Sequence, residues 1–475
     1  MSDQFDVVIV GARCAGASLA TRLADAGGSV LVLDADRLPS DMAMSTHFVQ
    51  PSGMDVLDEL GVGDRVRALA PASTRLRVDL DGSGMTARFA ENRAGYRIRR
   101  IHLDSFLQER AVAAGAELRD QSKVTGLLRD GERVTGVRVR GKHGDYEVNA
   151  KLVVGADGFN STIARLTGVE QYLDFDMTRG GYWFYWDKPA LWDTDAYPYD
   201  ALIHHQGDEL LCMFQCDGDK LLIVVAPPQE RVRAWGAAYR QHYLEWLRRC
   251  PVTAPLVEGR EPEGRGMGLL KAHFFYRRPV GPGFALVGDA GNFKDFVTGQ
   301  GITDALLHSR DLAAAILDGR EGAMEWYWRH RDVMSLPLYQ DARKQGAVGY
   351  NNAFNRMVLG RMGQTPELAE RALLMTDRKL APSEVLPFRT LLGWLAKDAL
   401  RGRFDALRSF PEVGKQVSAD QAELRNRVAK LAAAEAALGG APKPVRLTAS
   451  GKAAPRTGKV AAGAIPFAGA VAHGA

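Results

Sequence analysis

The chain of 475 residues contains four cysteines and no long apolar run. The cysteines have no metal-ligand spacing relative to histidine, so the sequence predicts free thiols and no metal site. No apolar stretch approaches the roughly 18 to 20 residues that a membrane-spanning helix needs. The acidic first residues lead directly into an apolar strand, which differs from a secretory signal. These absences predict a cytoplasmic protein without a transmembrane segment.

The body of the chain also lacks a net charge. The formal charge of +4 is carried by the C-terminus, because residues 436–475 contain five basic residues and no acidic one. The rest of the chain has 56 basic and 57 acidic residues, so a basic groove for nucleic acid is not expected. A hydrophobic content of 46% excludes a wholly disordered chain. The length corresponds to roughly two to four domains.

A strand, a glycine turn and a helix open the chain in the stretch FDVVIVGARCAG, residues 5–16. The turn departs from the dinucleotide-binding fingerprint G-x-G-x-x-G, because Arg13 occupies the position of the second glycine. The amides and the dipole at the N-terminus of such a helix attract phosphate. Asp34 ends the next strand near the spacing from Gly11 at which a carboxylate binds an adenosine ribose. Taken alone, the stretch fits either a nucleotide site or an ordinary strand–turn–helix.

Two later stretches repeat the arrangement of a buried strand followed by a loop and a helix. They are VVGADGFNSTIAR, residues 153–165, and GFALVGDAGNFKDFVTGQGITDALLHSRDLA, residues 283–313. In the second, Asp289 is suited to hold a polyol chain, and the amides near Gly301 and Ile302 face a site where negative charge develops. A reduced flavin carries such a charge. Chance could produce one such motif, but it would rarely produce all three in this order.

Together, the three motifs resemble the FAD-dependent monooxygenases of the single-component aromatic hydroxylase type. That family lies in a superfamily that also includes geranylgeranyl reductases and flavin-dependent halogenases. The resemblance extends from residue 5 to about residue 317 and implies an enzyme with bound FAD and NAD(P)H as transient electron donor. It implies cofactor contacts for fourteen residues, of which Asp157 would serve NAD(P)H as well. They are Gly11, Arg13, Cys14, Ala15, Gly16, Asp34, Arg37, Arg100, Val124, Asp157, Asp289, Gly299, Gly301 and Ile302.

Four residues depart from the pattern of the hydroxylases. We hypothesise that Arg13 makes a charge-assisted hydrogen bond to an FAD phosphate, the alternative being a side chain that points to solvent. Phe296 stands where relatives have a proline, and Thr303 where they have an asparagine, so substrate placement is expected to differ. His47 lies where many hydroxylases carry a flavin-gating arginine. It is either a catalytic acid/base that contacts the flavin or a packed loop histidine.

The predicted fold class is α/β with three structural regions. A Rossmann-like FAD-binding domain occupies residues 1–174 and 271–320, and an antiparallel β-sheet substrate domain is inserted at residues 175–270. A helical C-terminal region follows at residues 321–439, and a disordered basic tail at residues 440–475. Within the helical region, the sequence Ser-Ala-Asp-Gln at 418–421 is a capping-box pattern that predicts the start of the last helix.

Five consecutive aromatic residues, YWFYW at 182–186, lie at the start of the predicted antiparallel sheet. Because side chains alternate along a strand, Tyr182, Phe184 and Trp186 share one face, and the two residues between them share the other. In the family that the chain resembles, the flavin-facing side of this sheet covers the substrate. The register favours Tyr182, Phe184 and Trp186 as pocket residues, with Phe296 beside them, while core packing is the alternative for either face. The expected substrate is an apolar, aromatic or polycyclic small molecule.

The resemblance implies that O2 hydroxylates or epoxidises this molecule by way of a flavin C4a-(hydro)peroxide. A reductase or dehydrogenase of an isoprenoid or lipid-like substrate would share the same motifs. It is supported by PFRTLLGWLAKDALRGRF, residues 387–404, a basic amphipathic stretch suited to peripheral membrane contact or to packing and self-association. A flavin halogenase and a non-catalytic flavin-binding protein are also compatible with the motifs. No nucleic-acid partner is predicted, and a monomer or homodimer is expected.

Overall fold

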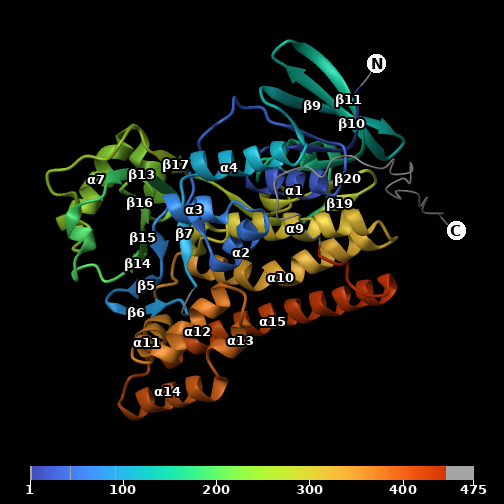
Figure 1. The fold of residues 1–475 in the computed structure, drawn as a ribbon. Helices are drawn as coiled ribbons and strands as arrows, with labels where there is room; N and C mark the ends of the chain where they lie inside the picture. The colour runs from blue at the N-terminus through green and yellow to red at the C-terminus, as the bar shows by residue number, and fades with distance from the viewer. Residues whose placement is uncertain (1–2, 43, 91–92, 445–475) are drawn as a thin grey trace.

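The computed structural model describes residues 3–42, 44–90 and 93–444. The predicted basic tail lies outside the described residues from position 445 onward. Two large sheets and several layers of helices make up the described part of the chain (Figure 1). The larger sheet has a parallel centre, and the other large sheet is mainly antiparallel. This arrangement confirms the predicted α/β fold class with an additional antiparallel sheet and a helical C-terminal region.

The parallel sheet is built around β1 (Asp3–Val10), which pairs in parallel with β2 (Val30–Leu33) and β11 (Gly144–Gly155). Its strand order is β19-β20-β11-β1-β2-β8. The first half of β11 pairs instead with β10, and β10 with β9, as an antiparallel extension of the sheet (Figure 1). The other strands of the sheet are β8 (Glu117–Arg119), β9 (Ser122–Asp130), β10 (Arg133–Gly141), β19 (Val280–Gly281) and β20 (Phe284–Leu286).

The central strand β1 is apolar on both faces because both faces of the sheet are covered. Val7 and Ile9 pack against a helical layer, while Val8 and Val10 pack against residues of β9 and β10. A continuous apolar run is typical of such a parallel strand. The helical layer consists of α1 (Cys14–Asp25), α4 (Arg100–Ala113) and α9 (Gly301–Asp318). Helix α1 packs against both α4 and α9.

The second large sheet has the strand order β17-β13-β16-β15-β14-β5-β6. Its hairpin β5 (Arg75–Leu80) and β6 (Ser83–Arg88) comes from much earlier in the chain than the predicted insertion at 175–270. The sheet extends beyond that insertion because β14 pairs in parallel with β5 along its second edge. The strands from the insertion are β13 (Gly181–Asp187), β14 (Ala201–Gln206), β15 (Glu209–Cys216), β16 (Lys220–Ala226) and β17 (Met267–Leu269).

The C-terminal region is helical as predicted, but its last helix begins earlier than the capping-box pattern indicates. Helix α15 runs from Asp405 to Leu438, so residues 418–421 lie inside it. Phe410 and Val413, on either side of Pro411, pack against a small apolar cluster of α11 and α14, which keeps this segment helical. The helices of the region are α10 (Ala323–Gly346), α11 (Ala353–Gly363), α12 (Pro366–Thr376), α13 (Pro382–Val385), α14 (Phe388–Leu400) and α15 (Asp405–Leu438).

Two three-stranded sheets and several short helices connect these layers. One small sheet has the order β12-β18-β21 and the other β3-β7-β4. Their strands are β3 (Phe48–Val49), β4 (Ala72–Ser73), β7 (Gly95–Arg97), β12 (Gln171–Asp176), β18 (His273–Arg277) and β21 (Asn292–Phe293). The short helices are α2 (Pro51–Glu59), α3 (Gly63–Leu69), α5 (Thr162–Thr167), α6 (Gln229–Trp235), α7 (Tyr239–Arg249), α8 (Ala254–Val257), and the 3-10 turns η1 (Ala190–Asp193), η2 (Gly236–Ala238), η3 (Gly288–Ala290) and η4 (Phe296–Thr298).

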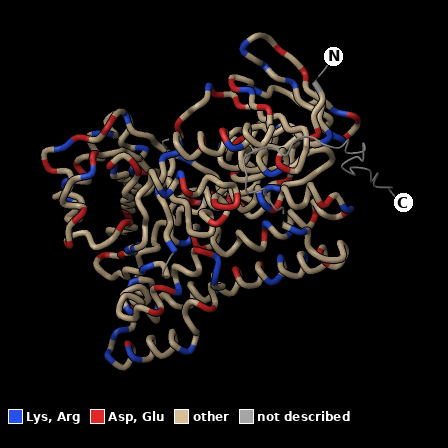
Figure 2. The backbone as a smooth tube through the Cα atoms, viewed as in Figure 1, with Lys and Arg blue, Asp and Glu red and all other residues tan. Residues whose placement is uncertain are grey.

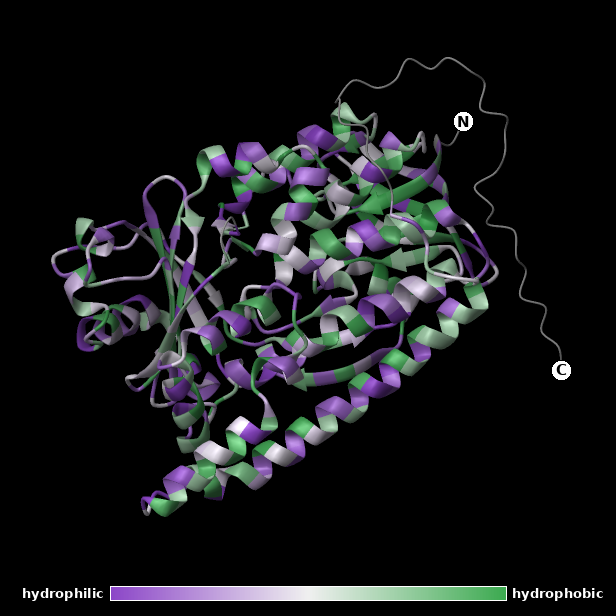
Figure 3. Ribbon diagram, turned by 60° about the horizontal axis from the view of Figure 1, so that its bottom comes forward, coloured by the Kyte–Doolittle hydropathy of each residue, from purple (hydrophilic) through white to green (hydrophobic). Residues whose placement is uncertain are grey.

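Charge and hydropathy are distributed as expected for a folded body without a net charge. Basic and acidic residues are interspersed over the backbone in Figure 2. Figure 3 shows α15 on the outside of the molecule, with polar residues along much of its length. Among the described residues, no helix combines the length and the apolar character needed to cross a membrane.

Candidate active site

A cavity of about 500 Å³ opens beside the carboxyl ends of β1, β2 and β11. Ligands of open α/β sheets bind at this end of the strands, so the position itself indicates a binding site. All three motifs reach the cavity from loops that are distant in sequence. Thirteen of the predicted site residues line it: Gly11, Arg13, Cys14, Ala15, Asp34, Arg100, Val124, Asp157, Asp289, Phe296, Gly299, Gly301 and Ile302.

The glycines of the first motif are required by close backbone contacts. A Cβ on Gly11 would lie 2.4 Å from the carbonyl oxygen of Ala156, and its φ of +105° is left-handed. A Cβ on Gly16 would lie 1.8 Å from the carbonyl oxygen of Gly11. Gly16 therefore does not line the cavity but lets α1 start directly against the turn. This geometry brings the N-terminus of α1 to the edge of the cavity.

A carboxylate from α4 accepts a hydrogen bond from the first amide of α1. Asp104 accepts hydrogen bonds from the amide and the thiol of Cys14, both at 3.1 Å, and forms an ion pair with Arg100 at 3.0 Å. Helix geometry leaves the next amides, those of Ala15 and Gly16, without intrahelical partners. The amide of Ala15, which lines the cavity, and the helix dipole remain available for an anion.

Arg13 lies at the mouth of this anion site. Its Nη2 donates to Asp36 at 3.1 Å and to Ser40 at 3.2 Å. Its Nη1 is buried without a hydrogen-bond partner among the described residues and forms an ion pair with Asp104 at 3.7 Å. A buried guanidinium nitrogen with no acceptor is costly unless a ligand supplies one. The predicted phosphate contact of Arg13 therefore has both the position and the free donor that it requires.

The carboxylates of Asp34 and Asp157 already accept hydrogen bonds from backbone amides of nearby loops. Asp34 accepts hydrogen bonds from the amides of Ala12, at 2.8 Å, and Asp36, at 2.9 Å. Asp157 caps α5 by accepting from the amide of Thr162 at 2.7 Å and from the hydroxyl of Ser161. Each carboxylate has about four lone-pair sites, so one or two remain for a ligand hydroxyl. Ribose binding by Asp34 and nucleotide binding by Asp157 stay predictions.

The third motif supplies a carboxylate without a hydrogen-bond partner in the described residues. Asp289 lies in η3, on the wall of the cavity near Gly301 at the start of α9. Its withdrawal from water raises the pKa of Asp289 to about 6, against the opposing effect of Arg100. Thr303, which stands at the family's asparagine position, accepts a hydrogen bond from the amide of Gln50 and so fixes the entry to α2.

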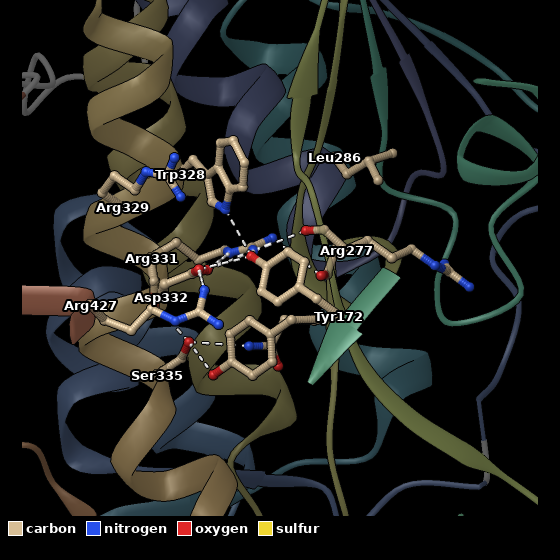
Figure 4. Close-up of polar contacts among 12 residues, drawn as sticks. Tyr172, Arg277, Leu286, Trp328, Arg329, Arg331, Asp332, Ser335 and Arg427 are labelled. Atoms are coloured by element: carbon tan, nitrogen blue, oxygen red, sulfur yellow. Dashed lines mark hydrogen bonds and ion pairs between the residues drawn. The ribbon is translucent and has the colours of Figure 1, made fainter. Parts of the chain in front are cut away.

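The loop that carries Asp289 is held in place by α10, through the contact of Arg331 with Gly291. Figure 4 shows the polar network around Arg331. Arg331 donates to the carbonyl oxygens of Gly291, at 3.2 Å, and Arg277, at 3.0 Å, and is 1% exposed. Tyr172 accepts from Arg331 at 2.9 Å and donates to Asp332 at 2.8 Å. Because these partners come from β12, β18 and α10, the network fixes three elements around one loop. The C-terminal region thus contributes to the site without lining it.

A buried lysine also reaches the cavity. Lys294 lines the cavity and forms an ion pair with Asp304 of α9, which pairs in turn with Arg378. Burial opposes the ionisation of Asp304, but the two cations lower its pKa to about 2. Asp304 and Arg378 also line a second cleft of about 160 Å³. These two ion pairs therefore connect the wall of the cavity to the C-terminal helical region.

Part of the cavity wall is aromatic. Trp183 of β13 meets Phe296 edge-on, with ring centroids 4.8 Å apart. Phe293 stacks on Phe159 at 4.7 Å and packs against Phe274 at 5.4 Å. All five rings line the cavity. This part of the wall can surround an apolar ring system on several sides.

The predicted choice of strand face in β13 was wrong. Tyr182, Phe184 and Trp186 point away from the cavity, into a cluster covered by α7. Their rings pack on Tyr239 and Tyr243 of that helix, with centroid distances of 4.5 Å for Tyr182–Tyr239 and Phe184–Tyr243. Because α7 covers this face of the sheet, the opposite face, which carries Trp183, lies toward the cavity.

His47 and Arg37 do not line the cavity. His47 is fully buried, with a φ of +56° and a hydrogen bond between its Nε2 and the hydroxyl of Tyr185. Burial, assisted by Arg100 and Arg99, lowers the pKa of His47 to about 3, so the ring is neutral at physiological pH. Arg37 is exposed on the loop after β2. The catalytic role of His47 and the cofactor contact of Arg37 stay predictions.

Three functional positions were missed in the sequence. Asp104 follows Arg100 by one helical turn, a spacing that indicates an ion pair on one helix face. Lys294 stands within the third motif, and its position between Phe293 and Asp295 gives no signal of burial. The face of β13 that carries Trp183 was not the one favoured, because only the position of α7 decides which face is covered.

The residues present fit FAD. Two glycines whose Cβ positions are filled by backbone, the start of α1 and the Nη1 of Arg13, which has no hydrogen-bond partner among the described residues, suit a diphosphate. The carboxylates of Asp34 and Asp289 suit ribose and ribityl hydroxyls. The volume of the cavity lies in the range of roughly 300 to 1,000 Å³ that is usual for cofactor sites.

The sequence matches the FAD binding domain family over residues 4–323, about two thirds of the chain. The chain belongs to this family and is an FAD-dependent oxidoreductase, as the resemblance of the three motifs predicts. The matched residues end at the start of α10.

Related proteins include both reductases and monooxygenases. The chain is 27% identical to digeranylgeranylglycerophospholipid reductase 1 of Methanopyrus kandleri, over 69% of the chain and 85% of the relative. It is 35% identical to 12-dehydrotetracycline 5-monooxygenase/anhydrotetracycline 6-monooxygenase of Streptomyces rimosus, over 35% of the chain. That match spans 33% of the monooxygenase, and a match to reductase 2 of Methanopyrus kandleri spans 40% of that enzyme.

Solved structures show the same fold at low identity. The structure of p-nitrophenol 4-monooxygenase PnpA from Pseudomonas putida matches with a TM-score of 0.69 and 18% identity, over 80% of this chain and all of that one. The flavin-dependent brominase Bmp2 matches with a TM-score of 0.67 and 18% identity, over 84% of this chain and 99% of that one. One fold thus carries several flavin reactions, and the choice among them depends on the cavity.

Proposed function

We propose that this protein is an FAD-dependent monooxygenase that uses NAD(P)H and O2 to hydroxylate or epoxidise an apolar, aromatic or polycyclic small molecule. The observation that carries the proposal is the aromatic end of the cavity, formed by Trp183, Phe296, Phe293, Phe159 and Phe274. These rings line the same cavity as the residues that fit FAD. A flat apolar substrate would therefore lie beside the reactive ring of the cofactor.

Bound FAD supplies the redox chemistry, and the chain supplies binding, orientation and exclusion of water. The amides at the start of α9, near Gly301 and Ile302, are placed to stabilise negative charge at the cavity wall. The rings of Trp183 and Phe296 restrict the plane of a bound aromatic molecule. The ion pair between Lys294 and Asp304 connects the segment around Lys294 to α9 and so holds this part of the cavity wall in position.

The proposal is tested by following NAD(P)H oxidation, oxygen uptake and peroxide release in the flavin-loaded protein. The probes are p-nitrophenol, anhydrotetracycline, apolar polycyclic compounds and a geranylgeranyl lipid, each with NADH and with NADPH. We expect at least one aromatic probe to stimulate oxygen uptake and NAD(P)H oxidation together. Turnover that requires a halide would indicate a halogenase, and absence of turnover with every donor and probe would indicate a flavin-binding protein. Either result would contradict the proposal.

A reductase of an isoprenoid or lipid-like substrate is the second candidate. It is supported by the match to digeranylgeranylglycerophospholipid reductase 1, which covers 85% of that relative. An apolar cavity wall also suits an isoprenoid chain. The two functions differ in their need for oxygen: a reductase converts the geranylgeranyl lipid under anaerobic conditions, and a monooxygenase leaves every probe unchanged without O2.

A further inference from the structure

Helix α14 carries an exposed apolar surface outside the region matched to the FAD binding domain family. Leu400 is 89% exposed and Phe388 is 61% exposed, with Leu392 between them on the same side. At about 100° per residue, these three positions span about a third of the helix circumference. Single exposed apolar residues are common on protein surfaces, but a contiguous stripe along one helix is not.

The neighbouring side of α14 accounts for the packing of the helix. Leu395 is 4% exposed and packs in a cluster with Phe354 and Ala406. Asp398 is also buried and forms an ion pair with Arg361 of α11 at 2.6 Å. The helix is therefore fixed to α11 and α15 without the stripe, so the exposed apolar side chains are not needed to hold α14 in place.

The apolar surface continues into the next turn and is surrounded by basic residues. Phe404 and Leu407 are 45% and 41% exposed. Among residues 387–408, five basic residues are exposed against one exposed acidic residue, Asp405. Four of the five have no carboxylate partner among the described residues, and Figure 2 shows Lys and Arg on α14 and the turn after it. They are Arg389, Lys397, Arg401 and Arg403.

We propose that α14 and the turn after it, residues 388–407, dock the protein on an anionic lipid surface. The α14 surface, as we call these residues, combines apolar side chains that can enter the acyl boundary with cations that bind lipid phosphates. The charge complementarity favours lipid over a second copy of the chain, since two copies would bring their cations together. Helix α14 lies at a corner of the molecule in Figure 1, where a flat surface can reach it.

Vesicle sedimentation of the full-length, flavin-loaded protein tests this proposal. We expect binding to phosphatidylglycerol vesicles, weak binding to phosphatidylcholine vesicles, and a loss of binding at high salt. One variant combines Phe388→Asp with Leu400→Asp, and another combines Arg401→Glu with Arg403→Glu. Each lost charge changes binding roughly fivefold, so both variants should reduce binding at least about tenfold. All four positions are exposed, and the flavin content of the variants shows that they fold.

Matched controls separate the α14 surface from general effects. Val112→Asp changes an apolar side chain that is 51% exposed on α4, and Arg140→Glu changes a basic side chain that is 68% exposed on β10. Both should bind vesicles like the unmodified protein. The basic tail is present in every variant, so differences between variants report the α14 surface.

Three results would overturn the proposal. The unmodified protein could remain unbound with phosphatidylglycerol vesicles, or all variants could bind equally, which would assign binding to the tail. Sedimentation velocity could instead show a dimer that Leu400→Asp dissociates, without lipid binding, which would make the surface a contact between copies. Flavin content and substrate turnover are measured separately, so failure of lipid docking is distinguishable from failure of the proposed function.

Discussion

The two ends of the cavity are built in different ways. At the cofactor end, backbone amides, glycines and carboxylates come from short segments in which a strand leads directly into a loop and a helix. At the aromatic end, Trp183 of β13 and Phe274 of β18 meet Phe159, Phe293 and Phe296 of the second and third motifs, and only the packing of sheets and helices brings these four segments together. The first kind of site is encoded locally and tolerates few substitutions. The second depends on which face of a strand is covered, and single changes there should alter substrate preference more than cofactor binding.

The largest effect is expected for Gly16→Ala at the cofactor end. The added Cβ would meet the carbonyl oxygen of Gly11 at 1.8 Å, and backbone cannot move aside as a flexible side chain can. We expect a loss of about 4 kcal/mol or more in the free energy of unfolding, with loss of bound flavin. Denaturant unfolding and flavin absorbance measure both effects.

Gly414→Ala is the matched control for this substitution. Gly414 lies within α15, and a Cβ there meets nothing within 4 Å. Alanine should leave flavin binding unchanged and stabilise the helix by about 0.5 to 1 kcal/mol. Equal flavin content in the two variants would contradict the close approach of α1 to the turn.

The second-largest effect is expected at Asp104, whose carboxylate accepts a hydrogen bond from the first amide of α1. Asp104→Ala removes the acceptor of the Cys14 amide and leaves Arg100 unpaired, which should lower the free energy of unfolding by about 3 kcal/mol. Flavin affinity should fall as well. Glu109→Ala on the same helix removes an exposed ion pair with Arg65 and should cost less than about 0.5 kcal/mol. Similar losses for the two variants would argue against a special role for Asp104.

The third prediction distinguishes the two faces of β13. Trp183→Phe changes the cavity wall and should raise KM for the preferred aromatic substrate about tenfold, with unchanged flavin content. Phe184→Leu changes the packing on Tyr243 and should cost about 1 kcal/mol of stability with KM unchanged. Steady-state kinetics and thermal unfolding of the two variants measure this difference. A KM change in Phe184→Leu alone would reverse the assignment of the faces.

The last prediction is a pH dependence at Asp289. Because burial raises its pKa from 3.8 to about 6, the folded protein retains this proton over a pH range in which the unfolded chain releases it. Stability of the flavin-free protein therefore decreases as pH rises from about 4 to about 6. Asp289→Asn removes this loss and should stabilise the flavin-free protein by up to about 3 kcal/mol at pH 7.

The same substitution should weaken FAD binding, since asparagine offers a poorer acceptor to hydroxyl groups. Below about pH 4 the stability of the variant and the unmodified protein should coincide. Thermal unfolding across this pH range, with and without FAD, measures both parts. A stability difference that persists at low pH would show that Asp289 contributes through packing rather than charge.

The sequence predicted most of the residues that line the cofactor end of the cavity because each of the motifs is local. The glycine turn, the strand end at Asp34 and the start of α9 each lie within a few residues of a recognisable strand or helix. The contribution of Asp104 comes from a helix 90 positions away from Cys14, and its role depends on the packing of α4 against α1. Local patterns do not specify such contacts.

The aromatic end and the edges of the second sheet were harder to predict for the same reason. Alternation in β13 correctly separated two faces, but the position of α7 determined which one is covered. The addition of β5 and β6 to the sheet depends on the pairing of β14 with a strand more than 100 residues earlier. The capping-box pattern inside α15 failed because tertiary packing around Pro411 extends the helix past it.

The most direct test of the proposed function is the source of the oxygen in the product. The flavin-loaded protein is supplied with NAD(P)H, isotopically heavy O2 and the aromatic compound that gives the fastest oxygen uptake, and the product is analysed by mass spectrometry. We predict a product that has gained one heavy oxygen atom and that does not form without O2. A product that gains only hydrogen, or that forms equally well under anaerobic conditions, would contradict the account.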